Sequence, residues 1–378
     1  ATLGKFRANV RNAGQANVLW IFTIKYIQEI EMRKVILLGL FSIFVLFNVS
    51  SQQIISPTEF VYVPEGNFKF NDSGNFAHVS SFYISKYEVT EQLYYKVIGK
   101  NPSKSSFGNL RDPKSPDWLK KRVAELDSQG IFLTDSSNCP VENVNWYEAI
   151  VFCNLLSIKE GLQPVYSLDG ETNPSKWGVI PQGHPTTRWG ARPLDENDMK
   201  WNSIKMNIKN NGYRLPTEME WLWAAMGATD NINLKYAGND NPYEPLKYAH
   251  YMFGDYSKGD NPPFPYKMPV GLKLPNALGI YDMSGNVNEW CWDWYDDLPN
   301  FDISDYTGPL VGKKEIAWLI DENGNKVDVW GGPVAYKVRK GGSQFDPDWA
   351  LFLNLRGGWY QPFNKDYDTG FRLVRTKM

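Results

Sequence analysis

One short turn combines oxygen donors with residues that bend the backbone. The carboxylates of Asp282 and Glu289 could meet the backbone carbonyls of Gly285 and Val287 at one point. Hard cations such as calcium take about 6–8 oxygen ligands, partly from carbonyls. The segment is therefore a candidate calcium site. Its local chemistry alone favours the alternative, a tight turn in which Asp282 and Asn286 hydrogen-bond to their own backbone.

A second segment, near the C-terminus, gathers aromatic rings with Asp and Asn side chains. Aromatic rings supply contact area at a low entropic cost, and Asp and Asn add adaptable hydrogen bonds. The pattern predicts a ligand-binding surface, and the alternative is that many of these rings fill the core. The candidate ligand-binding residues are Ser343, Phe345, Asp346, Asp348, Trp349, Asn354, Arg356, Trp359, Tyr360, Phe363, Asn364, Asp366 and Tyr367.

The chain contains, in a fixed order, the segments Phe60–Gly66, Phe82–Thr90, Pro140–Trp146, Gly212–Trp221, Leu278–Trp290, Val338–Ser343 and Gly370–Leu373. Together these segments resemble the formylglycine-generating, sulfatase-modifying-factor domain family. That resemblance implies an irregular α+β fold related to C-type lectins, with short strands, few helices and much loop. It also implies calcium at Asp282, Gly285, Val287 and Glu289, which match the calcium-binding positions of relatives.

The chain departs from the catalytic members of this family at the decisive place. Those members oxidise a cysteine of sulfatases to formylglycine, with copper held by paired cysteines shortly after the Gly-Gly-Ser segment. Here Ser343 is followed by a shortened interval to Arg356, and no cysteine occurs after Cys291. Copper(I) selects soft thiolate or thioether ligands. We therefore expect a non-catalytic member that binds no copper.

The leading hypothesis is a binding protein that holds an unknown protein or carbohydrate ligand at its C-terminal loop. The order of Gly-Gly-Ser, varied loop and Gly-Phe-Arg also resembles retroelement-diversified variable proteins, which use this fold to display a mutable binding face. One alternative is an oxidase with an atypical site that uses Cys291. Another is a structural component of a cell-surface or gliding apparatus.

The N-terminal residues suggest export. Residues 32–51 have the form of a signal peptide, with Met32-Arg33-Lys34 before the apolar run Val35–Val49. That run is short for a membrane span of about 20 residues. We expect residues 1–31 to be upstream read-through or a disordered leader, and residues 52–378 to form one secreted or periplasmic domain. The alternative is a signal anchor with a cytoplasmic leader.

Composition narrows the function classes further. Forty basic residues against 42 acidic ones give a formal net charge of −2, whereas nucleic-acid binding normally requires a basic face. Nucleotide-binding and hydrolase motifs do not occur. Three stretches look like insertions into the family frame, near residues 104–138, 163–210 and 296–336.

Several local signals predict the elements that must position these sites. Thr90, Asn145 and Thr217 are predicted helix N-caps. Leu93, Trp146 and Leu222 lie in the apolar stripes of the helices that follow them. A further amphipathic helix is predicted from Trp118 to Leu126. The predicted strands are Phe60–Val63, Ser81–Ser85 and Phe371–Arg375, and Asp321–Asp328 is predicted to be a hairpin turn.

Overall fold

The computed structural model describes residues 59–104, 117–128, 136–183, 192, 194–230, 234–238, 245–252, 267–310, 312, 318–320, 326–328, 335–357 and 360–377. The chain divides into two units, Ala1–Pro57 and Thr58–Met378, and all described residues belong to the second. The predicted leader and signal peptide therefore lie outside the described residues.

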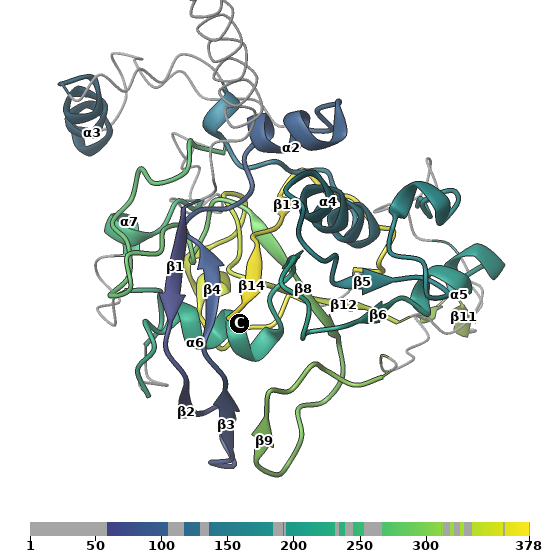
Figure 1. Ribbon diagram of the computed structural model, residues 1–378. Helices are drawn as coiled ribbons and strands as arrows, with labels where there is room; N and C mark the ends of the chain where they lie inside the picture. The colour runs from purple at the N-terminus through teal and green to yellow at the C-terminus, as the bar shows by residue number, and fades with distance from the viewer. Residues whose placement is uncertain are drawn as a thin grey trace, which may run out of the picture. The chain divides into compact units, whose positions relative to one another are not determined.

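A four-stranded antiparallel sheet joins segments from the two ends of the second unit (Figure 1). Its strand order is β1-β4-β14-β7, so the C-terminal strand β14 lies between an N-terminal strand and a middle one. The four strands are β1 (Phe60–Val63), β4 (Phe82–Ser85), β14 (Val374–Thr376) and β7 (Tyr213–Arg214). The strand predicted at Phe60–Val63 is confirmed, and the one predicted at Ser81–Ser85 begins one residue later.

A three-stranded sheet unites the family segments that carry the candidate sites. Strand β8 (Asn288–Trp294) is central, with β12 (Lys337–Lys340) antiparallel on one side and β13 (Thr369–Gly370) parallel on the other. Glu289 lies opposite both Lys340 and Gly370 in this register. The calcium-like turn, the Gly-Gly-Ser segment and the Gly-Phe-Arg segment therefore meet at one place.

The strand predicted at Phe371–Arg375 is wrong in its bounds. The chain leaves the three-stranded sheet after Gly370 and joins the four-stranded sheet at Val374. Between them, the backbone of Leu373 exchanges hydrogen bonds with Ser85, whose amide donates to Leu373 O at 2.7 Å and whose Oγ accepts from Leu373 N at 3.0 Å. This crossing ties the two sheets together.

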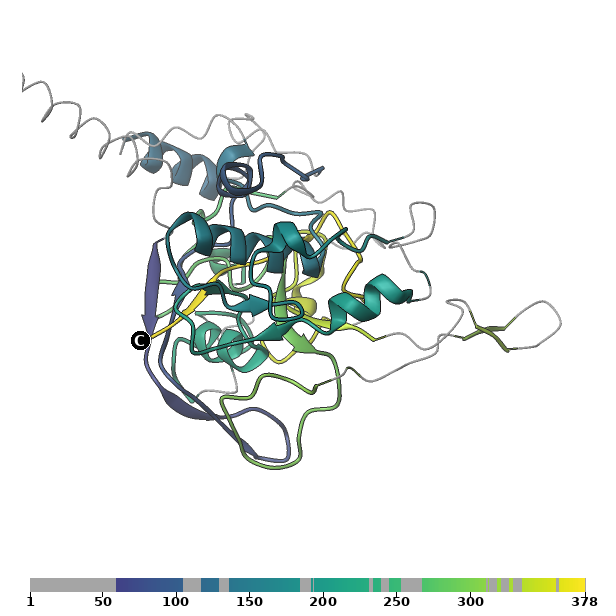
Figure 2. The ribbon, with the colours of Figure 1, turned by 45° about the vertical axis from the view of Figure 1, so that its right-hand side comes forward.

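The remaining strands form three small sheets. One contains β2 (Gly66–Lys69), β3 (Phe76–Val79) and β9 (Ile303–Ser304), and another pairs β5 (Tyr166–Ser167) with β6 (Lys205–Met206). A third, the two-stranded ribbon in Figure 2, pairs β10 (Trp318–Ile320) with β11 (Lys326–Asp328) in antiparallel register. Residues 321–325 of the predicted hairpin turn lie outside the described residues, and Lys326–Asp328, predicted as part of that turn, is a strand.

Three helices begin at the predicted N-caps. The Asn145 and Thr217 side chains accept from the amides of Glu148 and Glu220, whose carboxylates accept from the cap amides in return. The capped helices are α2 (Glu91–Ile98) after Thr90, α4 (Trp146–Lys159) after Asn145 and α6 (Glu218–Ala225) after Thr217. The other helices described are α3 (Asp117–Ser128), α5 (Glu196–Asn202), α7 (Pro245–Tyr248) and the 3₁₀ turns η1 (Ser136–Asn138), η2 (Pro174–Lys176) and η5 (Asp348–Leu351).

Helix α6 runs through the hydrophobic core, because all eight of its residues are buried. Its Trp221 and Trp223 pack with Phe68 and Ile84 from the strands around it, and the Phe68 and Trp223 rings stack at 5.4 Å between centroids. The Trp223 indole donates to Pro64 O at 2.8 Å. The sequence of a helix that is buried on every side is apolar all round and lacks a single apolar face.

A buried ion pair links this core to the three-stranded sheet. Arg372 donates from Nε and Nη2 to the two carboxylate oxygens of Glu289, at 2.6 Å each. Trp221 Nε1 donates to the same carboxylate at 2.7 Å, and Arg372 also donates to the carbonyls of Ser85 and Tyr281. Neither charged side chain is more than 1 % exposed.

Removing one partner of this ion pair should lower the free energy of unfolding. Arg372→Met leaves the Glu289 carboxylate buried without its cation, and we expect a loss of about 3–5 kcal/mol in urea unfolding. The double variant R372M/E289Q should recover part of that loss, because no uncompensated charge remains. Lys176→Met, which breaks an exposed pair with Glu171, is the control and should change little. Equal losses in R372M and K176M would contradict this reading.

Candidate functional site

The loop after β12 turns sharply at the Gly-Gly-Ser segment. Gly341 and Gly342 adopt φ values of 94° and 67°, which favour glycine. A Cβ on Gly342 would lie 2.6 Å from Leu351 Cδ2 and 2.9 Å from Ala350 O. The loop from residue 344 to residue 355 therefore folds back onto a position that only glycine can occupy.

A buried lysine donates hydrogen bonds to the backbone of this loop. Lys340 is 2 % exposed, and its Nζ donates to the carbonyls of Leu353 and Leu355 at 2.7 Å each. Further backbone bonds run from Gln344 N to Asn286 O and from Leu353 N to Lys235 O, both at 2.9 Å. The loop is thus fixed along its length, which lowers the entropic cost of using it to bind a partner.

Several predicted ligand-binding side chains point into solvent from this fixed backbone. Trp349 is 59 % exposed, Phe345 41 % and Tyr367 51 %. The segment that carries Tyr367 lies beside the loop, because Gln344 Nε2 donates to Tyr367 O at 3.3 Å. We call the exposed set the loop surface; its members are Phe345, Asp348, Trp349, Asn354 and Tyr367.

A polar cluster lies behind the loop surface, directly after the Gly-Gly-Ser turn. Ser343 Oγ donates to Asp346 Oδ2 at 2.8 Å and lies 3.3 Å from Asp368 Oδ2. Asn288 Nδ2 lies 3.3 Å from both of these carboxylate oxygens. Burial raises the pKa of Asp346, and the nearby charge of Asp368 raises it further.

An arginine and a tyrosine complete the polar cluster. Arg339 donates from Nη1 to Thr369 Oγ1 at 2.5 Å, and the same atom lies 3.5 Å from Asp368 Oδ1. Its guanidinium carbon lies 3.4 Å from the centre of the Tyr360 ring, and Tyr360 Oη donates to Asp366 Oδ2 at 2.5 Å. Burial, followed by the charge of Asp368, also raises the pKa of Asp366.

Other predicted ligand-binding residues lie elsewhere in the fold. Arg356 makes two hydrogen bonds to the Glu218 carboxylate, at 2.7 and 2.8 Å, and its guanidinium lies over the Tyr295 ring. It therefore anchors the end of the loop to helix α6. Phe363 and Asn364 are buried, at 0 % and 2 % exposure. Trp359 lies outside the described residues.

Sequence reasoning missed Asn288, Arg339 and Thr369 of the polar cluster, and it left Asp368 out of the candidate ligand-binding residues. One signal was available, because Asp366 and Asp368 are two residues apart beside a strand and such residues share a face. No comparable signal exists for Asn288 and Arg339, which reach the cluster only through the pairing of β8 with β12 and β13.

The thiols in the described structure are shielded from solvent. Cys291 and Cys153 are both fully buried, and burial raises the pKa of each thiol. Only the thiolate is a strong nucleophile and metal ligand. Cys153 is a buried residue of helix α4, and Cys291 does not open onto the polar cluster as the oxidase alternative would require.

The calcium-like turn is a tight structural corner in this arrangement. Gly285 has a φ of 84°, and a Cβ there would lie 2.2 Å from His250 O. Asp282 accepts from Gly271 N at 2.7 Å, and burial raises its pKa to about 6. Both oxygens of Glu289 are bound to Arg372, so this carboxylate does not fit a calcium ligand unless the ion pair opens. Calcium binding at Asp282, Gly285, Val287 and Glu289 stays a prediction.

Two kinds of structural feature are absent from the described residues. No group of three or more His, Cys, Asp or Glu side chains among them is arranged to hold a metal ion. In the same part of the chain, no helix has both the length and the apolar character to cross a membrane.

The family model described as "Sulfatase-modifying factor enzyme 1-like domain" matches residues 47–377. The chain belongs to this family. The α+β fold with small sheets, few helices and much loop is the family fold, as the sequence predicted.

Relatives within the sulfatase-modifying-factor family include catalytic and other proteins. The chain is 37 % identical to "Chaperone protein LppX" of Paenibacillus barcinonensis over 248 residues, which is 63 % of this chain and 72 % of that one. It is 30 % identical to the formylglycine-generating enzyme of Bos taurus over 253 residues, or 63 % and 59 % of the two chains. Among solved structures, "Treponema denticola variable protein 1" superposes with a TM-score of 0.57 at 28 % identity, covering 84 % of this chain and 95 % of that one.

Removing the charge of Asp346 should stabilise the fold in a pH-dependent way. A carboxyl whose pKa is raised on folding contributes stability below its unfolded pKa, and that contribution is lost as the pH rises through the folded pKa. Asp346→Asn keeps an acceptor oxygen, so its melting temperature should exceed that of the wild type at pH 7. The difference should shrink towards pH 4. The exposed Asp348→Asn is the control, and a loss of stability in D346N at pH 7 would contradict the argument.

Removing the buried ammonium should loosen the loop without unfolding the protein. Lys340→Met leaves the carbonyls of Leu353 and Leu355 without their donor, and each unmade buried hydrogen bond costs about 1–3 kcal/mol. We expect the amides of residues 344–355 to exchange hydrogen faster while those of β8 stay protected. Lys86→Met, on a solvent-facing pair with Glu59, is the matched control. Unchanged exchange in K340M would show that the lysine does not hold the loop.

Proposed function

We propose that this chain is a non-catalytic member of its family and that the loop surface binds extended polypeptide segments. The observation that carries the proposal is the fixed loop of residues 344–355, which exposes Phe345 and Trp349 after the Gly-Gly-Ser turn. Exposed aromatic side chains on a rigid backbone are typical of binding hot spots. The loop contains no sulfur donor.

The chemistry of the polar cluster supports binding rather than oxidation. The Asp346 and Asp368 carboxylates share donors from Ser343 and Asn288, and these are hard oxygen and nitrogen groups. Hydrogen-bonding groups of this kind could accept from and donate to the backbone amides of a bound peptide. The carboxylate, hydroxyl and amide groups of the polar cluster are hard ligands, so they cannot replace the paired thiolates that bind copper(I).

The name of one relative favours a polypeptide over a carbohydrate ligand. The relative from Paenibacillus barcinonensis is named a chaperone protein. The structural neighbour from Treponema denticola is named a variable protein.

We also propose export of the domain, on the strength of the signal-like residues 32–51. N-terminal sequencing of secreted protein tests the cleavage after that segment.

The aromatic side chains of the loop surface should carry most of the affinity. We expect the purified protein to slow the aggregation of chemically reduced insulin, followed by light scattering. The triple variant F345A/W349A/Y367A should lose this effect, because each aromatic anchor contributes about 2 kcal/mol or more at such surfaces. Phe301→Ala is the matched control, since Phe301 is 65 % exposed but lies outside the loop.

Two outcomes would contradict the proposed function. Equal protection of insulin by the wild type and the triple variant would show that the loop surface is not the binding face. Binding of a glycan array that depends on the same three rings, without protection of insulin, would assign the surface to carbohydrate instead.

A further inference from the structure

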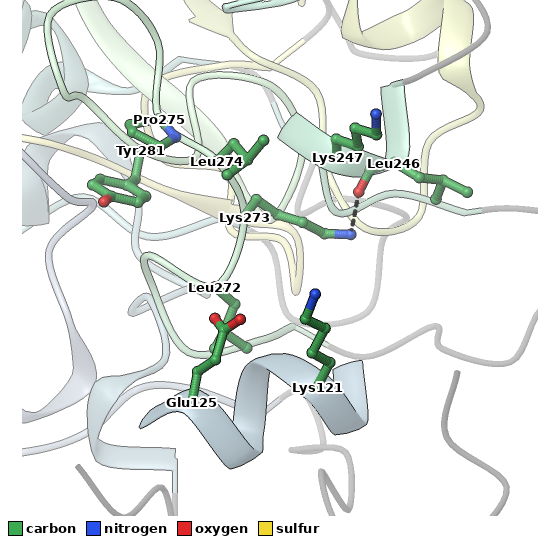
Figure 3. A pocket seen from close by; sticks show the side chains of 9 residues that line it. All are labelled: Lys121, Glu125, Leu246, Lys247, Leu272, Lys273, Leu274, Pro275 and Tyr281. Carbon is green, nitrogen blue, oxygen red and sulfur yellow. Dashed lines mark hydrogen bonds between the residues drawn. The ribbon is translucent and has the colours of Figure 1, made fainter. Parts of the chain in front are cut away.

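A pocket of about 400 Å³ lies between helix α3, helix α7 and the segment from Leu272 to Pro275 (Figure 3). That volume is within the range of small-molecule sites. None of its lining residues belongs to the loop surface or to the polar cluster. The apolar part of the lining is Leu246, Leu272, Leu274, Pro275 and Tyr281, and the charged part is Lys121, Glu125, Lys247 and Lys273.

Hydrogen bonds fix the inner wall of the pocket. Lys273 is 5 % exposed, and its Nζ donates to Leu246 O at 2.6 Å, as the dashed line in Figure 3 shows. Leu274 N donates to Lys247 O at 2.9 Å, which joins the segment to α7 a second time. Tyr281 is held by the bond from its amide to Lys86 O at 3.0 Å. The wall is therefore formed before any ligand arrives.

The charges around the pocket favour an anion. Of the described residues, three lysines and one glutamate line it, so the formal charge of this described lining is positive. Lys121 and Glu125 are four residues apart on α3 and share one face of that helix. Burial lowers the pKa of Lys273 to about 7, and an anion beside its Nζ would favour the ammonium form.

We propose that this pocket binds a monocarboxylate that carries an apolar chain. The lysines pair with the carboxylate, and the leucines, Pro275 and Tyr281 cover the apolar chain. Glu125 opposes a second carboxylate on the same ligand, so a dicarboxylate is disfavoured. The carboxylate can come from a free organic acid or from the C-terminal residue of a peptide. The inference does not depend on the polypeptide binding proposed for the loop surface.

The experiment compares acids with their neutral amides by isothermal titration calorimetry. The probes are hexanoate and hexanamide, and the peptide acetyl-Gly-Gly-Leu with a free or an amidated C-terminus. We expect at least one acid to bind and its amide to bind more than about tenfold more weakly, as loss of a charge-assisted contact implies. Binding of hexanoate alone identifies a free acid, and binding of the free peptide alone identifies a C-terminus.

Variants connect the binding to the lysines. K121M/K247M changes two exposed side chains, so it should fold normally and bind the acid about tenfold or more weakly. Lys205→Met, on an exposed position of β6 outside the pocket, should bind like the wild type. The triple variant F345A/W349A/Y367A should also keep this binding, which separates a failure here from a failure of the proposed function. Absence of binding by both acids, equal binding of acids and amides, or unchanged affinity in K121M/K247M would overturn the proposal.

Discussion

The pairing of Glu289 with Arg372 is the constraint on which the site depends. It joins Gly-Phe-Arg, the last segment of the family pattern, to the acidic turn at the start of β8. Trp221 of α6 is a third partner, because its indole donates to the Glu289 carboxylate. A buried ion pair is stable only if every member keeps its partner. The pair therefore fixes β8 and β13 relative to the core. Because β12 pairs with β8, the position of the loop after β12 is fixed as well.

The same construction explains how a loop without cysteines can remain a defined surface. The backbone is held by Lys340 and by the turn at Gly342, so the outward side chains do not determine the loop's shape. Phe345 and Trp349 extend into solvent without taking part in the core. Side chains on such a surface can differ between relatives at little cost in stability, which suits recognition of different partners.

Local signals in the sequence predicted the helices well because each signal acts within a few residues. Examples are the capping boxes at Asn145 and Thr217. The strand Phe60–Val63 was predicted from its local composition in the same way. The site was predicted only in part because its geometry depends on long-range pairing. Nothing local shows that Arg356 would turn to Glu218 and not to a ligand, or that Phe363 would point inward. The pocket formed by α3, α7 and the Leu272–Pro275 segment was invisible to sequence reasoning for the same reason.

The most direct test of the account is to map where an unfolded polypeptide touches the protein. Reduced insulin B chain carrying a photoreactive group would be cross-linked to the domain, and the cross-linked positions read by mass spectrometry. The account predicts that cross-links concentrate on residues 344–355 and on Tyr367. Cross-links concentrated on the β2–β3 hairpin or around β10 and β11, with none on the loop, would contradict it, as would conversion of a substrate peptide's cysteine to formylglycine by the purified protein.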